Sequence, residues 1–253
     1  MTELQGRVAL ITGASRGIGA VAARDLSDHG VSVVLVARTG DQIERAAKDI
    51  SERGGRAEAV IADVSRFHEM EKAVVRAVSS FGALDILVNN AGVIDPIARI
   101  DESDPEAWSN VVDINLKGVY FAVRAALPHM LKQGSGVIIN LSSGAATGAL
   151  EGWSHYCATK AAVLSLTKCL HKEYAGHGIR TVGLSPGTVA TDMQVVIKAS
   201  GVNPVSQLNP AVHIPPEWVG KAISFLATKA AREFDGGDFS LKTEEGRRRV
   251  GLE

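Results

Sequence analysis

Short apolar runs alternate along the chain with longer segments that have the period of an amphipathic helix. The run Val33–Val36 has no polar residue, which is typical of a strand covered on both faces. Repeated strand–helix–strand units joined by short turns predict a parallel sheet with right-handed crossovers. We therefore expect a doubly wound, three-layer α/β/α fold around a mostly parallel, seven-stranded sheet.

The expected elements follow one another along all 253 residues, 1–253, as a single domain. Strands are expected at Val8–Thr12, Val31–Ala37, Ala57–Ala62, Leu84–Asn89, Val137–Ser142, Arg180–Ser185 and Asp238–Leu241. Helices are expected at Gly17–His29, Asp41–Arg53, Arg66–Phe81, Pro105–Leu131, Trp153–Gly176 and Glu217–Thr228. The periodicity fails between Pro186 and Pro216, where we expect a long loop or small helical lid over about 188–214.

The composition argues against several kinds of partner. The net charge is -1, whereas proteins that bind nucleic acid normally carry a basic excess, so we expect no nucleic acid. The sequence contains no run of eighteen apolar residues, which is about the length that a membrane-spanning helix requires. Two cysteines and irregularly spaced histidines predict neither a disulfide framework nor a metal site. The polar N-terminus lacks the apolar core of a signal peptide, so we expect a cytoplasmic protein.

A glycine-rich turn, Thr12–Gly19, lies where the first expected strand leads into the first helix. Its glycines allow positive φ and let the backbone approach a pyrophosphate, which the helix N-terminus can bind. The spacing departs from G-x-G-x-x-G, and a tight connection without a ligand is the alternative. Its place in the first βαβ unit favours a dinucleotide site.

The end of the second expected strand indicates which dinucleotide binds. NAD normally requires an acid there, which accepts hydrogen bonds from the adenosine ribose. This chain has Ala37 at that position, followed by Arg38, and Arg16 lies in the glycine-rich turn. Two guanidinium groups can fork onto a 2′-phosphate, so the pair predicts NADP(H). The alternative is that both are solvated surface arginines.

Tyr156 and Lys160 are four residues apart in an expected helix and therefore share one face. A tyrosine with a pKa of about 10 is a poor base at neutral pH. We expect the nearby ammonium to bring the pKa of Tyr156 down toward neutrality. Such a pair is common on helices without any function, so its interpretation depends on the motifs around it.

Taken in order, these motifs resemble the short-chain dehydrogenase/reductase family, including members similar to 3-oxoacyl-ACP reductases. The resemblance covers most of the chain and rests on T-G-x-x-x-G-x-G at Thr12–Gly19, Asn89-Asn90-Ala91-Gly92, Asn115, Ser142-Ser143, Tyr156-x-x-x-Lys160 and Pro186-Gly187. It implies a Rossmann-like fold and hydride transfer between a nicotinamide and a carbonyl or secondary alcohol.

The resemblance also implies roles for particular residues. Tyr156 would be the general acid/base beside Lys160, Ser143 would bind the substrate oxygen, and Asn115 would hold a water that connects the lysine to solvent. The implied cofactor contacts are Gly13, Ser15, Arg16, Gly17, Ile18, Gly19, Arg38, Asp63, Val64, Asn90, Ala91, Gly92, Tyr156, Lys160, Pro186, Gly187, Val189 and Thr191. A homo-oligomer, tetramer or dimer, is expected, although Phe234–Leu241 matches the family's last strand only loosely and a charged tail, Lys242–Arg249, follows it.

The apolar composition of the lid favours a carbonyl substrate with hydrophobic bulk. Its ceiling would be Met193, Val195, Val196, Ile197, Val202, Val205 and Leu208, above walls formed by Ile94, Pro96, Ile97, Ala145, Leu150 and Trp153. Two alternatives remain. One is an NAD-linked alcohol or polyol dehydrogenase, which the missing acid at Ala37 opposes. The other is a catalytically idle dinucleotide sensor or scaffold, which the intact set of four catalytic residues opposes.

Overall fold

Seven strands form one sheet in the order β3-β2-β1-β4-β5-β6-β7. The structure is a computed structural model that describes residues 2–252. The strands are β1 (Val8–Thr12), β2 (Ser32–Ala37), β3 (Ala57–Ile61), β4 (Ile86–Asn89), β5 (Gly136–Leu141), β6 (Ile179–Ser185) and β7 (Asp238–Ser240). The predicted doubly wound fold is confirmed, and every neighbouring pair of strands is parallel.

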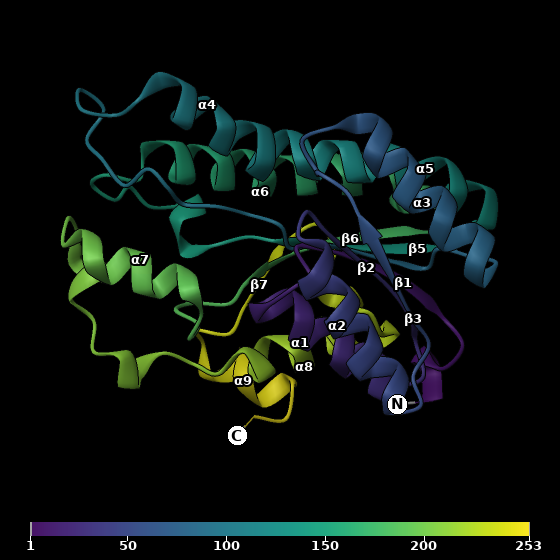
Figure 1. Ribbon diagram of the computed structural model, residues 1–253. Helices are drawn as coiled ribbons and strands as arrows, with labels where there is room; N and C mark the ends of the chain where they lie inside the picture. The colour runs from purple at the N-terminus through teal and green to yellow at the C-terminus, as the bar shows by residue number, and fades with distance from the viewer. Residues whose placement is uncertain (1, 253) are drawn as a thin grey trace.

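Helices cover both faces of this sheet (Figure 1). One face carries α3 (Phe67–Phe81), α4 (Pro105–Val112), α5 (Gly118–Gln133) and α6 (Ser154–Tyr174). The other carries α1 (Gly17–Asp28), α2 (Gly40–Glu52) and α8 (Pro216–Leu226). Short 3-10 turns are η1 (Thr2–Leu4), η3 (Gly144–Ala146), η4 (Ala175–His177), η5 (Pro204–Gln207), η6 (Pro210–Val212) and η7 (Lys229–Phe234). Within residues 2–252, no helix combines the length and the apolar character that crossing a bilayer requires.

The strands are apolar throughout because both of their faces are buried. Successive residues of a strand point to opposite faces of the sheet. Leu10 and Val34 accordingly pack with α3 and α5, whereas Ile11 and Leu35 pack with α1 and α8. Full burial of such a side chain contributes roughly 1.5–3 kcal/mol relative to exposure. The core therefore consists of two apolar layers separated by the sheet.

The segment expected to be one helix over Pro105–Leu131 is divided. A π-helical stretch, η2 (Asp113–Lys117), separates α4 from α5. Asn115 lies in this stretch, and its side chain makes two hydrogen bonds of 2.8 Å to the backbone of Val93. The side-chain amide of Asn115, in the π-helical stretch, therefore connects this helical region to the loop after β4.

Two further segments contain helices, and the first of them agrees with the expected small helical lid. The proline-containing region contains α7 (Asp192–Ser200), which begins soon after β6 and projects beyond the sheet edge (Figure 1). The charged tail contains α9 (Glu244–Arg249), where Thr243 caps the helix by accepting a hydrogen bond of 3.0 Å from the N–H of Gly246. Arg249 forms an ion pair with Glu233. The tail is therefore a docked helix.

A chain of buried polar side chains fixes α6 against the sheet. The amide of Asn89 donates to Asn140 at 2.8 Å, and the amide of Asn140 donates to Thr167 at 2.8 Å. These bonds connect β4, β5 and α6 across the interior. Leaving a buried amide without a hydrogen-bond partner costs free energy. This series of hydrogen bonds therefore restricts the position of α6 relative to β4 and β5.

We expect Gly178→Ala to destabilise the protein by at least about 1–2 kcal/mol. Gly178 has a φ of 81°, and a Cβ there would lie 2.2 Å from the carbonyl oxygen of Gly134. Gly176→Ala in the same turn is the control, because its Cβ would meet nothing within 4 Å. Urea unfolding measures both free energies, and equal stability of the two variants would contradict the expectation.

Candidate active site

A cleft of about 620 Å³ lies at the carboxyl ends of the strands. Its size is within the usual range for small-molecule sites. The structure brings most of the predicted cofactor residues into its lining: Gly13, Ser15, Arg16, Gly17, Ile18, Arg38, Asp63, Val64, Asn90, Ala91, Gly92, Tyr156, Lys160, Pro186 and Thr191. Gly19, Gly187 and Val189 are outside the lining, as are the predicted catalytic residues Asn115 and Ser143.

The glycine-rich turn leaves a cradle at the N-terminus of α1. Gly13 and Gly17 have φ of 64° and 55°, and a Cβ on Gly13 would lie 2.9 Å from the Cα of Ala91. The N-cap residue, Arg16, makes no side-chain capping bond, so the first N–H groups of α1 face the cleft without such a cap. This arrangement fits the pyrophosphate of a dinucleotide. Gly19 serves packing, since a Cβ there would lie 2.3 Å from the carbonyl oxygen of Gly13.

One end of the cleft is formed by the turns after β2 and β3. Ala37, Arg38, Thr39 and Gln42 line it together with Asp63. Partial burial alone would raise the pKa of Asp63, but hydrogen bonds from Ser65 hold it below its usual value. Thr39 and Gln42 were missed from the sequence. Thr39 directly follows Arg38, and Gln42 lies four residues beyond it in the first turn of α2, so both positions follow from the expected strand end.

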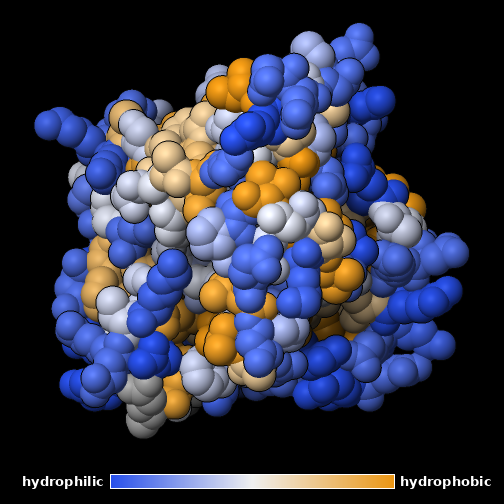
Figure 2. All heavy atoms as spheres, turned by 90° about the vertical axis from the view of Figure 1, so that its left-hand side faces the viewer, coloured by the Kyte–Doolittle hydropathy of each residue, from blue (hydrophilic) through white to orange (hydrophobic). Residues whose placement is uncertain are grey.

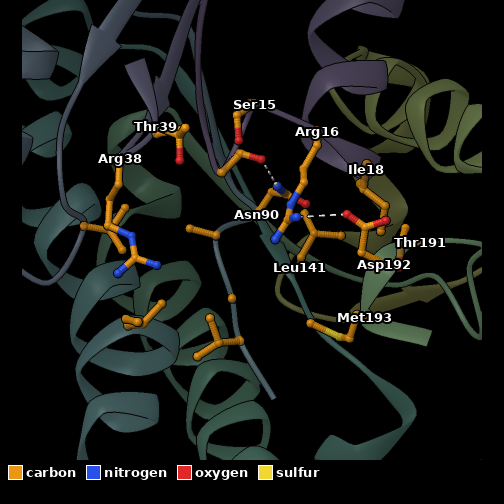
Figure 3. Close-up of a pocket in the computed structure, with 18 of the residues that line it drawn as sticks. Ser15, Arg16, Ile18, Arg38, Thr39, Asn90, Leu141, Thr191, Asp192 and Met193 are labelled. Atoms are coloured by element: carbon orange, nitrogen blue, oxygen red, sulfur yellow. Dashed lines mark hydrogen bonds and ion pairs between the residues drawn. The ribbon is translucent and has the colours of Figure 1, made fainter. Parts of the chain in front are cut away.

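The two arginines do not converge. Arg16 pairs with Asp192 of α7, with an Nη1–Oδ2 distance of 2.9 Å, and Arg38 lies on the opposite side of the view from this pair (Figure 3). Both partners are more than two-thirds exposed, so the pair contributes at most about 1 kcal/mol. Arg38 forms no ion pair within residues 2–252. The expected fork of two guanidinium groups is therefore not formed in this structure.

Tyr156 projects from the first turns of α6 and is almost completely buried. Its ring meets that of Trp153 edge-on, with 5.6 Å between the ring centres. Burial raises the pKa of Tyr156 to about 12, while a hydrogen bond with Ser143 acts in the opposite direction. The expected lowering of this pKa is therefore wrong for the protein as it stands, because desolvation of the phenolate outweighs every other influence.

Lys160 is buried one helical turn beyond Tyr156. Its Nζ lies 5.6 Å from the centre of the tyrosine ring and donates a hydrogen bond of 2.6 Å to the carbonyl of Leu141. Burial lowers the pKa of Lys160 to about 8, and the nearby carboxylate of Asp238 opposes this change. The lysine therefore stays mainly charged at neutral pH by a narrow margin.

Ser143 and Asn115 approach the tyrosine from two sides. Ser143 lies two residues after the end of β5 and caps η3, where its hydroxyl accepts a hydrogen bond of 3.1 Å from the N–H of Ala145. The amide of Asn115, besides its bonds to Val93, lies 3.4 Å from the hydroxyl of Thr159, which donates to the carbonyl of Tyr156 at 3.0 Å. Asn115 thus connects the loop after β4 to the helix that carries the tyrosine.

The substrate side of the site is closed by an apolar cluster. Ile197 of α7 packs with Trp153 and Tyr156, and Met193 and Val205 adjoin the cluster. From the expected walls, it also contains Ile94, Ile97, Ala145 and Leu150. Val195 and Val196 are exposed and do not form the ceiling. Figure 2 faces the side on which α7 lies and shows scattered hydrophobic patches among hydrophilic side chains.

The comparisons with known proteins agree with this geometry. A family model described as short chain dehydrogenase matches residues 7–200. A 3-oxoacyl-[acyl-carrier-protein] reductase of Synechocystis is 38% identical, covering 94% of this chain and 95% of its own. A cis-4-hydroxycyclohexanecarboxylate dehydrogenase of Sinomonas cyclohexanicum is 39% identical over 89% and 90% of the two chains.

The chain belongs to the short-chain dehydrogenase family and is an oxidoreductase of that family acting on CH–OH and C=O groups. The fold also matches that of an NAD⁺-bound xylitol dehydrogenase, with a TM-score of 0.88 over 94% of this chain and 98% of the other. That pair is only 23% identical, so the match establishes the fold alone.

We expect residues 188–212 to exchange amide hydrogens faster in the free protein than in the ternary complex with cofactor and substrate. Ile197 of the lid belongs to the same apolar cluster as Trp153 and Tyr156, so we expect substrate binding at Tyr156 to move this segment and then hold it in place. Hydrogen exchange with mass spectrometry measures this difference, and peptides from α3, which does not line the cleft, serve as an internal control for the lid. Equal, strong protection of the lid in both states would contradict the expectation.

Proposed function

We propose that the protein is an NADP(H)-dependent oxidoreductase that interconverts a carbonyl and a secondary alcohol, with Tyr156 as general acid/base. The observation that carries the chemistry is a buried phenol one helical turn from a buried lysine, whose Nζ lies 5.6 Å from the centre of the phenol ring. Both groups reach a cleft that fits a dinucleotide.

The cofactor residues support the choice of dinucleotide. The glycine cradle and the N–H groups of α1 would hold the pyrophosphate, and Arg38, Thr39 and Gln42 would surround the 2′ position of the adenosine ribose. No carboxylate takes the place of Ala37 at the end of β2. When bound, the nicotinamide supplies or accepts the hydride.

The protein's own residues would manage the proton and the substrate oxygen. Ser143 would bind the carbonyl oxygen and hold it beside the phenol, which donates its proton during reduction and takes one back during oxidation. Lys160 would place a positive charge near the phenol when oxidation requires the phenolate. The apolar cluster around Trp153 and Ile197 would exclude water and favour a substrate with hydrophobic bulk.

Assembly into a homo-oligomer is part of the same proposal. The exposed ring of Tyr120 and the exposed side chain of Leu131 on α5 support a partner surface along this helix. Sedimentation velocity on the full chain distinguishes a dimer or tetramer from a monomer.

We expect Tyr156→Phe to lower kcat by at least about 100-fold, because general acid–base groups typically contribute 10²–10⁴-fold. NADPH affinity, followed by fluorescence, should change little, since the phenol proton is needed only in the chemical step. The assay is NADPH oxidation with a panel of carbonyl compounds. Retention of more than about a tenth of the wild-type kcat would exclude Tyr156 as the acid. A wild type that binds NADPH but turns over no compound would indicate an idle sensor.

We expect Arg38→Ala to weaken NADPH binding by about ten- to a hundred-fold, because a hydrogen bond to a charged group contributes roughly 1.5–3 kcal/mol. NADH, which has no 2′-phosphate, should be almost unaffected. Arg45→Ala on the exposed side of α2 is the matched control and should change neither. The measurement is kcat/KM for both cofactors. A wild type that prefers NADH, or equal weakening of both cofactors, would favour the NAD-linked alternative.

A further inference from the structure

Asp238 places a carboxylate beside the end of β5, close to the candidate active site. It lies on the edge strand β7 and pairs with Gly183 of β6 in the parallel register. Its Oδ2 accepts a hydrogen bond of 3.3 Å from the hydroxyl of Ser142. A Cβ on Gly183 would lie 2.6 Å from the Oδ1 of Asp238. The carboxylate therefore lies against Gly183 of β6, in the space that a side chain at position 183 would occupy.

Lys160 reaches the same strand end from α6. Its Nζ donates to the carbonyl of Leu141 at 2.6 Å, and Leu141 immediately precedes Ser142. The ammonium and the carboxylate therefore bond to adjacent residues, one at the last position of β5 and one directly after it, without a direct ion pair between them. Lys160 is buried, whereas Asp238 is exposed at the edge strand, so water screens only part of their attraction.

We propose that Asp238 is a positioning residue that acts through Lys160, keeping its side chain charged and directed at the end of β5. The catalytic consequence rests on the function proposed above, whereas the electrostatic coupling does not. A glycine at position 183 and a serine at position 142 are the features that allow the carboxylate to reach this place.

The direction of the coupling follows from the charges around the lysine. Burial favours neutral Lys160, and the negative charge of Asp238 opposes it. Partial burial raises the pKa of Asp238 to about 6, so the carboxylate is mainly ionised at neutral pH and loses its charge below that value. Other titratable groups lie around this pair. The phenol of Tyr156 lies beside Lys160, and the thiol of Cys157 lies beside the tyrosine. The ammonium of Lys168 attracts the carboxylate of Asp238. Removing the carboxylate should therefore lower the pKa of Lys160.

The test is an NMR titration of the full chain labelled with ¹³Cε-lysine, in which the Lys160 signal is assigned by its loss in Lys160→Arg. We expect Asp238→Asn to lower the midpoint of Lys160 by roughly 0.5–1 pH unit. Gly183→Ala should also lower the midpoint of Lys160, because the new methyl group displaces the carboxylate of Asp238. This variant keeps Asp238 itself, so the net charge of the protein does not change. Glu233→Gln, which removes a carboxylate that pairs with Arg249, is the matched control and should leave the midpoint unchanged. An unchanged midpoint in Asp238→Asn would overturn the proposal.

This titration needs no turnover, so its outcome is independent of whether the proposed function is correct. A carbonyl compound that the wild type reduces supplies the second measurement. The alkaline limb of kcat/KM should move to lower pH in Asp238→Asn, while thermal unfolding stays near that of the wild type. A role in folding alone would lower kcat/KM by the same factor at every pH, and that result would contradict the proposal.

Discussion

Hydrogen bonds between the ends of β1 and β4 hold the cleft in place. The hydroxyl of Thr12 accepts from the N–H groups of Asn90 and Ala91, each at 3.1 Å. The amide of Asn90 donates in return to the carbonyls of Thr12 and Gly13, at 2.9 and 3.1 Å. These two strands are neighbours at the point where the strand order reverses, and their connections leave toward opposite faces of the sheet. A crevice is therefore inevitable there, and the hydrogen bonds set its width.

Burial then decides the chemical state of the groups in this crevice. It raises the pKa of Tyr156 and lowers that of Lys160, so it favours the neutral form of both. A neutral phenol is the form that can donate a proton to a developing alkoxide. Oxidation by the proposed mechanism would instead require the phenolate, which positive charge near the phenol favours. The carboxylate of Asp238 is significant in this context because it preserves the charge on the lysine against burial.

The strands and most of the cleft could be predicted from sequence because they depend on local pattern. Apolar runs identify buried parallel strands, and parallel strands end at one edge, so residues that follow them converge. The features that could not be predicted depend on contacts between distant segments. The pairing of Arg16 with Asp192 spans 176 residues, and the bond from Ser142 to Asp238 spans 96. The direction of the pKa shift of Tyr156 likewise depends on how deeply α7 and its neighbours bury the ring.

The two halves of the site respond differently to a ligand. The dinucleotide half is an open cleft with exposed charged side chains, whereas the substrate half is filled by Ile197 against Trp153. On the function proposed above, displacing Ile197 would cost roughly 1.5–3 kcal/mol of lost burial. Apolar substrate surface packed against Trp153 would restore this burial, whereas a polyol would not restore it and would bury hydroxyl groups without partners. The proposed preference for a substrate with hydrophobic bulk therefore depends on this closed cluster.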